Sequence, residues 1–140
     1  MEEKRILAID YGLKRIGLAL SDPLLIFAYP FETIQNTEKM YDELLKIISE
    51  KNVFKILLGY PTNDRGESSD FTKQVLKFKE ELSKKTSIEI ILRDERYTSI
   101  MAQENVLQSV TKKIKRRDKG LIDRNSAAII LQEFLDEYKK

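Results

Sequence analysis

Five short apolar runs, separated by polar or turn-forming segments, predict five β-strands. They cover residues 5–10, 16–20, 27–34, 53–60 and 88–92. Residues 6–9 are all apolar and show no alternation, which predicts a central strand buried on both faces. Pro30 lies within the third run. Because proline cannot donate a hydrogen bond to a strand ladder, this strand should lie at an edge or contain a bulge.

Apolar residues at helical spacing predict four helices. The first covers residues 37–51, and the second carries Phe71, Val75, Phe78 and Leu82 on one face. The third begins at a cap provided by Thr98 or Ser99, and the fourth at Asp123 or Asn125. Phe71, Phe78 and Phe134 lie on apolar helix stripes, so we expect them in the core rather than as stacking platforms.

The order of these elements predicts the fold class. Three consecutive strands followed by alternating helices and strands indicate an α/β fold. Its single mixed sheet should be antiparallel at one edge and covered by helices. A chain of 140 residues with no internal repeat and no evident linker fits one domain over residues 1–140.

The composition excludes several classes of chemistry. The chain contains no Cys and no His, which removes His-based acid–base catalysis and every metal site built on those ligands. Charged residues make up 34% of the chain, and no apolar run approaches the length of a membrane span. The acidic start at Glu2 and Glu3 does not resemble a signal peptide. We therefore expect a soluble protein of the cytoplasm with no membrane partner.

Positive charge is concentrated in one segment. Residues 112–124 carry a net charge of +5, whereas the whole chain carries +2. A local basic patch on a nearly neutral body is typical of a polyanion partner. A solvated loop is the alternative, and charge alone does not decide between them. The basic residues of the segment are Lys112, Lys113, Lys115, Arg116, Arg117, Lys119 and Arg124.

Acidic residues lie where the predicted strands end. Asp10 ends the first strand, Glu95 follows the fifth, and Asp123 precedes the last helix. Sites in open α/β sheets form outside the carboxyl ends of the strands, so Asp10 and Glu95 should face one crevice. Carboxylates gathered there would need cations between them. Oxygen ligands alone suit Mg²⁺ or Mn²⁺, and paired ions of this kind cleave phosphodiester bonds.

Each carboxylate also has a structural interpretation. Asp10 could shape a turn before Gly12, and Glu95 could form a surface ion pair with Arg93 or Arg96. Asp123 taken alone suits the N-cap of a helix better than a metal site. Thr98 and Ser99 are most simply helix caps.

Four motifs in order resemble the YqgF/RuvX family over essentially the whole chain. The first is Asp10-Tyr11-Gly12-Leu13-Lys14-Arg15-Ile16-Gly17-Leu18-Ala19. The second is Leu58-Gly59-Tyr60-Pro61 with Asn63 and Gly66. The third is Asp94-Glu95-Arg96-Tyr97-Thr98-Ser99, and the fourth is Lys119-Gly120-Leu121-Ile122-Asp123 with Ser126-Ala127-Ala128.

The resemblance implies an RNase H-like fold and a nuclease function. The fold would be a five-stranded mixed sheet, with the first three strands antiparallel and helices on both faces. The function would be metal-dependent cleavage of structured RNA, at the 5′ end of pre-16S rRNA during ribosome biogenesis, with ribosomal precursor particles as partners. The family's acidic positions fall on Asp10, Glu95 and Asp123, which would hold Mg²⁺ or Mn²⁺.

If the protein is a nuclease, basic residues near the three acidic positions would bind phosphate groups of the substrate. Lys14 and Arg15 lie in the first turn, and Arg96 follows Glu95. The cluster Lys112, Lys113, Lys115, Arg116 and Arg117 would bind the nucleic-acid backbone outside the active site and add affinity without sequence information.

Three other functions remain to be weighed. Cleavage of Holliday-junction DNA is the first, and a catalytically silent nucleic-acid-binding module of the same fold is the second. A sugar-kinase-like or actin-like ATPase would also place Asp-x-Gly after its first strand. That class needs a second such domain and a Gly-rich adenosine loop, which 140 residues with five Gly do not provide.

Overall fold

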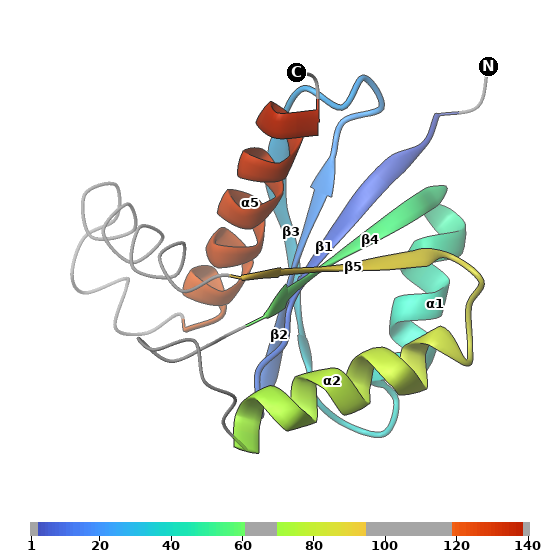
Figure 1. Ribbon diagram of the computed structural model, residues 1–140, viewed down its shortest axis with the longest axis vertical. Helices are drawn as coiled ribbons and strands as arrows, with labels where there is room; N and C mark the ends of the chain where they lie inside the picture. Colours follow the sequence, from blue (N-terminus) through green and yellow to red (C-terminus); the bar gives the residue numbers. More distant parts are fainter. Residues whose placement is uncertain (1–2, 61–69, 95–118, 139–140) are drawn as a thin grey trace.

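The structure is a computed structural model that describes residues 3–60, 70–94 and 119–138 (Figure 1). The strands are β1 (Arg5–Asp10), β2 (Arg15–Ser21), β3 (Ala28–Gln35), β4 (Val53–Tyr60) and β5 (Glu89–Asp94). The helices are α1 (Met40–Glu50), α2 (Asp70–Ser83) and α5 (Lys119–Tyr138). The strands form one sheet in the order β3-β2-β1-β4-β5.

The sheet is mixed, as predicted. β1 pairs with β2, and β2 with β3, in antiparallel orientation. β1 pairs with β4, and β4 with β5, in parallel orientation. Parallel strands need a crossover, and α1 and α2 supply the crossovers that lead into β4 and β5. The predicted mixed sheet, antiparallel at one edge, is confirmed.

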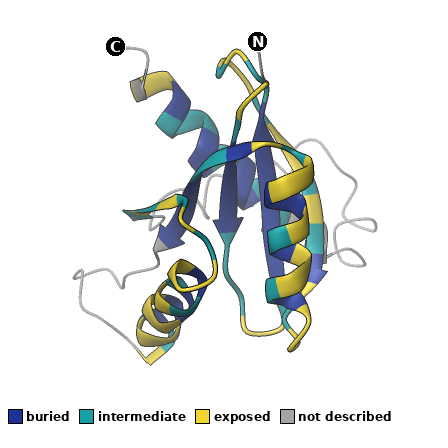
Figure 2. Ribbon diagram, turned by 90° about the vertical axis from the view of Figure 1, so that its right-hand side faces the viewer, coloured by how far each residue is buried: buried dark blue, intermediate teal, exposed yellow. Residues whose placement is uncertain are grey.

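β1 is the central strand and separates two apolar clusters. Leu7 and Ile9 pack with α1 and α2 on one face, whereas Ile6 and Ala8 pack with α5 on the other. These four side chains are at most 1% exposed, which confirms the predicted central strand. Figure 2 shows the buried sheet between helices whose outer surfaces are exposed.

β3 is an edge strand and contains a bulge. Leu18 of β2 pairs with Glu32, but the next residue, Ala19, pairs with Pro30. Phe31 is therefore an extra residue on β3, and the ladder is irregular where proline has no N–H to donate. Both positions predicted for the Pro30 strand, an edge and a bulge, are confirmed.

The helices agree with the apolar pattern except at one boundary. Met40, Leu44, Ile47 and Ile48 of α1 are buried, as are Val75, Phe78 and Leu82 of α2. Phe71 and Phe134 are partly buried and pack against the two clusters. The predicted helix that starts at Thr98 or Ser99 lies outside the described residues.

The last helix starts earlier than predicted, at Lys119 rather than at Asp123 or Asn125. The prediction placed a capping residue just before the apolar stripe. Lys119, Leu121 and Ile122 form helix readily enough to extend it, and Gly120 costs little in a first turn whose N–H groups have no partner in the helix. None of the helices in the described part of the chain is long and apolar enough to cross a membrane.

α5 is held against the sheet by side chains as well as by its apolar face. Gln132 accepts a hydrogen bond from the backbone N–H of Ala28 at 2.8 Å and donates one to the carbonyl oxygen of Ile26 at 3.0 Å. These bonds attach the middle of α5 to the β2–β3 connection. The helix therefore has a defined position along β2 and β3.

Candidate active site at the carboxyl ends of the parallel strands

The strand register brings the ends of β1, β4 and β5 to one edge of the sheet. Ile9, Leu58 and Leu92 are paired across the three parallel strands. Asp10 comes one residue after Ile9, so it lies just beyond this row at the carboxyl end of β1, where it is half-buried. This is the edge at which open α/β sheets place their sites.

β4 separates Asp10 from the end of β5. β1 and β5 both pair with β4, so their axes lie roughly 9–10 Å apart, twice the strand spacing. Asp10 and a carboxylate just after β5 would share a site only across bridging ions. Glu95 and Arg96 lie outside the described residues.

Side-chain alternation assigns Asp10 to the face covered by α5. Ile6 and Ala8 belong to the cluster under α5, and Asp10 continues this series two residues further on. Gly17, its partner on β2, follows the same alternation as Ala19 of that cluster. Any ligand bound by Asp10 would therefore lie between the sheet edge and the start of α5.

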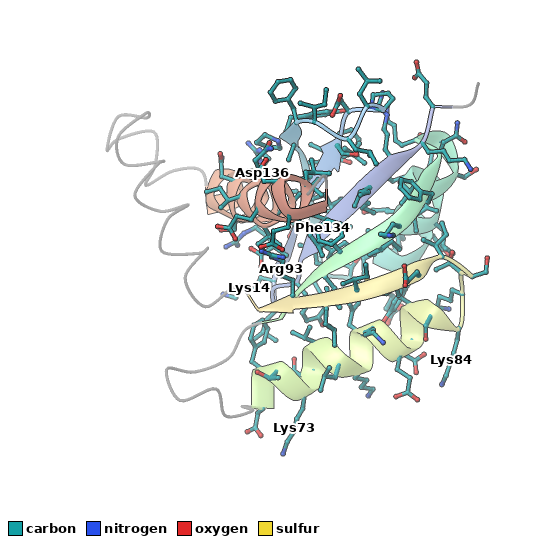
Figure 3. The ribbon with its side chains drawn as sticks, turned by 45° about the horizontal axis from the view of Figure 1, so that its top comes forward. Lys14, Lys73, Lys84, Arg93, Phe134 and Asp136 are labelled. Carbon is teal, nitrogen blue, oxygen red and sulfur yellow. The ribbon has the colours of Figure 1, made fainter. Side chains whose placement is uncertain are left out.

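Arg93 of β5 binds α5 through two glutamates. Its two terminal nitrogens donate to the carboxylate of Glu137 at 2.8 and 2.9 Å, and Glu133 lies 3.7 Å away (Figure 3). The hydrogen bond with Glu137 raises the pKa of Arg93 against the opposing effect of partial burial. Arg93 thus has acidic partners on α5, and its charge needs no ion pair with Glu95.

The N-cap interpretation of Asp123 is wrong, because α5 begins four residues before it. Asp123 lies one helical turn before Ala127 and two turns before Ile130, and both of these residues are buried against the sheet. Its backbone position is therefore on the sheet-facing stripe of α5, near the N-terminus of the helix. This backbone position is on the same face of the sheet as Asp10.

A hydrogen bond connects the start of α5 to the row of the sheet that contains Asp10. Arg124 donates from Nη1 to Oγ1 of Thr33 at 3.1 Å. Thr33 pairs with Gly17, and Gly17 pairs with Asp10. The residue next to Asp123 is thus attached to the row that contains Asp10. The pattern of the sequence did not identify Thr33, because its role depends on a strand register that no local signal reveals.

The β1–β2 turn places two cations close to Asp10. Lys14 is exposed and Arg15 is half-buried. Asn36 holds the turn, since its side-chain amide donates to the carbonyl of Gly12 at 2.8 Å and its backbone N–H donates to the carbonyl of Lys14 at 2.9 Å. Figure 3 shows Lys14 at the same end of the sheet as Arg93. The sequence alone places the turn close to Asp10. The structure adds the two hydrogen bonds of Asn36 that hold the turn.

The full predicted ligand set is not brought together by the described residues. Within residues 3–60, 70–94 and 119–138, no group of three or more Asp, Glu, His or Cys side chains is placed to hold a metal ion. Asp10 and the backbone of Asp123 are described, and Glu95 is not. The basic cluster at residues 112–117 also lies outside the described residues.

Two solved structures to which this chain is similar are Holliday-junction resolvases of the RNase H-like fold. The fowlpox virus resolvase in complex with Holliday-junction DNA aligns with a TM-score of 0.60, covering 97% of this chain and 99% of the resolvase at 13% identity. RuvC of T. thermophilus with its Holliday-junction substrate aligns with a TM-score of 0.57, covering 96% of each chain at 11% identity. At these identities the likeness establishes the fold, which confirms the RNase H-like class.

The sequence assigns the family. A model of the family described as "RuvX: Holliday junction resolvase" matches residues 4–137, and the chain belongs to this family. A protein of Porphyromonas gingivalis is 44% identical over 133 residues, covering 94% of this chain and 96% of its own length. A protein of Sulfurihydrogenibium is 42% identical over 134 residues, covering 94% and 90%. Both are named "Putative pre-16S rRNA nuclease".

Proposed function

We propose that this protein is a metal-dependent nuclease that processes the 5′ end of pre-16S rRNA on ribosomal precursor particles in the cytoplasm. Membership of the RuvX family supports a nuclease, and the names of its relatives support the rRNA substrate. The single structural observation behind the proposal is the position of Asp10. It lies at the carboxyl end of the central strand, on the face that the start of α5 covers.

Asp10, Glu95 and Asp123 are the residues proposed to hold the metal. Their donors are carboxylate oxygens, which fit Mg²⁺ or Mn²⁺, and the chain has no Cys or His to offer a softer site. A bound ion of this type would supply Lewis-acid stabilisation of a phosphodiester transition state and a more acidic water. The attachment of Arg124 to Thr33 supports the inclusion of Asp123, because it holds the neighbouring residue above the row of Asp10.

Basic residues are proposed to bind the substrate backbone. Lys14 and Arg15 lie within five residues of Asp10 on a turn held by Asn36, so they suit a phosphate next to the cleaved bond. Arg96 is proposed to contact a phosphate near Glu95. The cluster Lys112, Lys113, Lys115, Arg116 and Arg117 is proposed to bind the backbone farther away.

Cleavage of Holliday-junction DNA is the second candidate. It is favoured by the description of the family and by the fold shared with two junction resolvases. A silent nucleic-acid-binding module of the same fold is the third, and it differs from the other two only in lacking cleavage.

One experiment distinguishes the three. End-labelled RNA containing the 5′ boundary of 16S rRNA and a four-way DNA junction are incubated with the protein in Mg²⁺, in Mn²⁺ and in EDTA. The proposed function requires metal-dependent cleavage of the RNA and its loss in Asp10→Asn. Cleavage of the junction alone supports the second candidate, and binding of either substrate without cleavage supports the third.

A further inference from the structure

A shallow surface cavity of about 380 Å³, largely open to solvent, adjoins the β1–β2 turn, and the residues that line it do not include the proposed metal ligands. It is lined by Gly12, Leu13, Lys14, Arg15 and Phe71, so it lies between the turn and the start of α2. Its volume falls within the range of small-ligand sites, roughly 300–1,000 Å³. The cavity is therefore large enough for one nucleotide unit.

The turn that forms one wall is held in a defined conformation. The two hydrogen bonds of Asn36 to Gly12 and Lys14 fix both sides of it. A Cβ atom at position 12 would collide with the backbone carbonyl oxygen of Arg15, so the turn closes tightly only with Gly12. This wall is thus preorganised for a ligand, which lowers the entropy lost on binding.

Apolar side chains are held at the surface of this cavity. Leu13 is 60% exposed, and it lies on the turn that Asn36 holds. Phe71 is half-buried, and its ring stacks on Tyr11 with centroids 6.2 Å apart and planes 28° apart. The prediction that Phe71 is only a core residue is therefore incomplete, because the same ring also lines the cavity.

The residues that line the cavity are complementary to a nucleotide. Leu13 and Phe71 offer apolar contact for a base, and Lys14 and Arg15 offer charge for a phosphate. An apolar peptide would not use these cations, and a free anion would not use the two apolar side chains. The combination favours a unit that carries both an aromatic base and a phosphate.

The cavity lies beside the proposed carboxylate site rather than within it. Asp10 belongs to the face of the sheet covered by α5, whereas Tyr11 contacts Phe71 and Phe78 of α2 on the opposite face. Three residues of extended chain span at most about 11 Å, so the Cα atoms of Asp10 and Leu13 are no farther apart than this. An occupant would lie within a few nucleotides of the cleaved bond.

We propose that this cavity binds an unpaired nucleotide of the substrate strand, with its base against Leu13 and Phe71 and its phosphate on Lys14 and Arg15. The inference rests on the proposed nuclease function. It adds that the substrate needs a single-stranded segment next to the cleavage site, since a paired base is not available to the cavity.

The test measures binding without cleavage, by fluorescence anisotropy in EDTA. Three labelled RNA hairpins are used: one with a single-stranded overhang of about five nucleotides, one with the same overhang lacking its bases, and one with a blunt end. The variants are Leu13→Ala and Phe71→Leu, and Leu76→Ala is the matched control. Leu76 is an exposed apolar residue of α2 that does not line the cavity. Circular dichroism verifies the fold of each variant.

The proposal expects Phe71→Leu to weaken binding of the normal overhang by about tenfold, or about 1.4 kcal/mol, because the stacking of a base on an aromatic ring is lost. Leu13→Ala removes only an apolar contact and should weaken binding of the same overhang to a smaller extent. Affinity for the abasic and blunt RNAs should stay unchanged, and Leu76→Ala should bind all three like the wild type. Equal weakening on all three RNAs, or no weakening on any, would overturn it. The binding assay does not depend on cleavage, so the two proposals can fail separately. A protein that binds in this way but does not cut in the cleavage experiment would refute the nuclease function while supporting the cavity.

A second measurement locates the base directly. A 4-thiouridine in the overhang is irradiated in the complex, and crosslinked peptides are mapped by mass spectrometry. Crosslinks to residues 11–15 and to Phe71 support the proposal. Crosslinks confined to other peptides, with the overhang still needed for affinity, would overturn the assignment to this cavity.

Discussion

Arg124 on α5 donates a hydrogen bond to the hydroxyl of Thr33 on β3 at 3.1 Å. Thr33, Gly17 and Asp10 lie in one row across β3, β2 and β1. The bond therefore attaches the first turns of α5, including the backbone of Asp123, to the row that ends the central strand. A shift of this helix would move Asp123 relative to Asp10, so the bond is a positioning element of the proposed site.

Removal of the Asp10 charge should abolish cleavage and leave the fold intact. Asp10→Asn keeps the shape of the side chain but loses a charged metal ligand, and we expect the cleavage rate to fall by about a hundredfold or more. Thermal stability without metal should be unchanged or higher, because repulsion among carboxylates is relieved. Gel assays of cleavage and thermal denaturation measure both effects. Asp42→Asn, an exposed residue of α1, is the control. An Asp10→Asn protein that cuts at the wild-type rate would refute the catalytic assignment.

Loss of the Thr33 hydroxyl should lower the catalytic rate more than substrate affinity. Thr33→Val retains the β-branched shape and removes the hydrogen-bond acceptor for Arg124. We expect a stability loss of about 1 kcal/mol and a fall in kcat of about tenfold, since small displacements of catalytic groups are costly. Steady-state kinetics separate kcat from KM, and Thr33→Ser should restore activity because it keeps the oxygen. If Thr33→Ser is as slow as Thr33→Val, the hydroxyl does not position the site.

Asp22 should make stability depend on acid pH through the β2–β3 connection. Burial works to raise its pKa, but hydrogen bonds from the backbone N–H groups of Phe27, Ile26 and Leu24 together hold the pKa below its usual 3.8. A carboxyl whose pKa is lower in the folded state than in the unfolded state stabilises the folded protein at any pH above the unfolded-state pKa. This stabilisation is lost as the pH falls through the lower pKa of the folded state.

The matching variant is Asp22→Asn, which keeps an acceptor oxygen without a titrating group. At pH 7 the wild type should be the more stable protein, and the difference should shrink as the pH is lowered through 3.8 and below. Urea denaturation at several pH values measures it. A difference that stays constant down to pH 2.5 would show that the Asp22 charge does not stabilise this turn.

The basic cluster should contribute affinity rather than chemistry. A variant with Lys112, Lys113, Lys115, Arg116 and Arg117 changed to Gln should bind RNA more weakly and cleave at the same rate when saturated. Each lost phosphate contact should flatten the slope of log affinity against log salt by about 0.7–0.9. Binding titrations at several salt concentrations measure the slope. A variant with five lysines near α2 changed to Gln carries the same loss of charge and is the control. The control changes Lys73, Lys77, Lys79, Lys84 and Lys85.

An unchanged slope in the cluster variant would make residues 112–117 a solvated segment. The binding surface would then shift to Lys14, Arg15 and Arg96. A slope that flattens equally in both variants would show only a response to net charge, and it would contradict a specific role for the cluster.

Local patterns were sufficient for the elements of the sheet. The unbroken apolar run at residues 6–9 predicted a strand covered on both sides, and Ile6 to Ile9 do separate two clusters. Pro30 predicted an edge strand or a bulge because proline lacks an N–H, and β3 has both features. Such properties depend on the residue itself and on its immediate neighbours, so sequence reveals them. Asp10 was identified as a candidate for the same reason, since it is the charge that ends a buried strand.

Tertiary structure alone decided how these elements meet. The insertion of β4 between β1 and β5, the row that joins Asp10 to Thr33, and the contact of Arg124 with that row all depend on pairing between distant segments. The early start of α5 and the cavity beside Phe71 likewise depend on packing between elements. The periods of 2 and 3.6 residues that reveal strands and helices carry no information on which strand pairs with which. That choice is made by burial and hydrogen bonding over the whole domain.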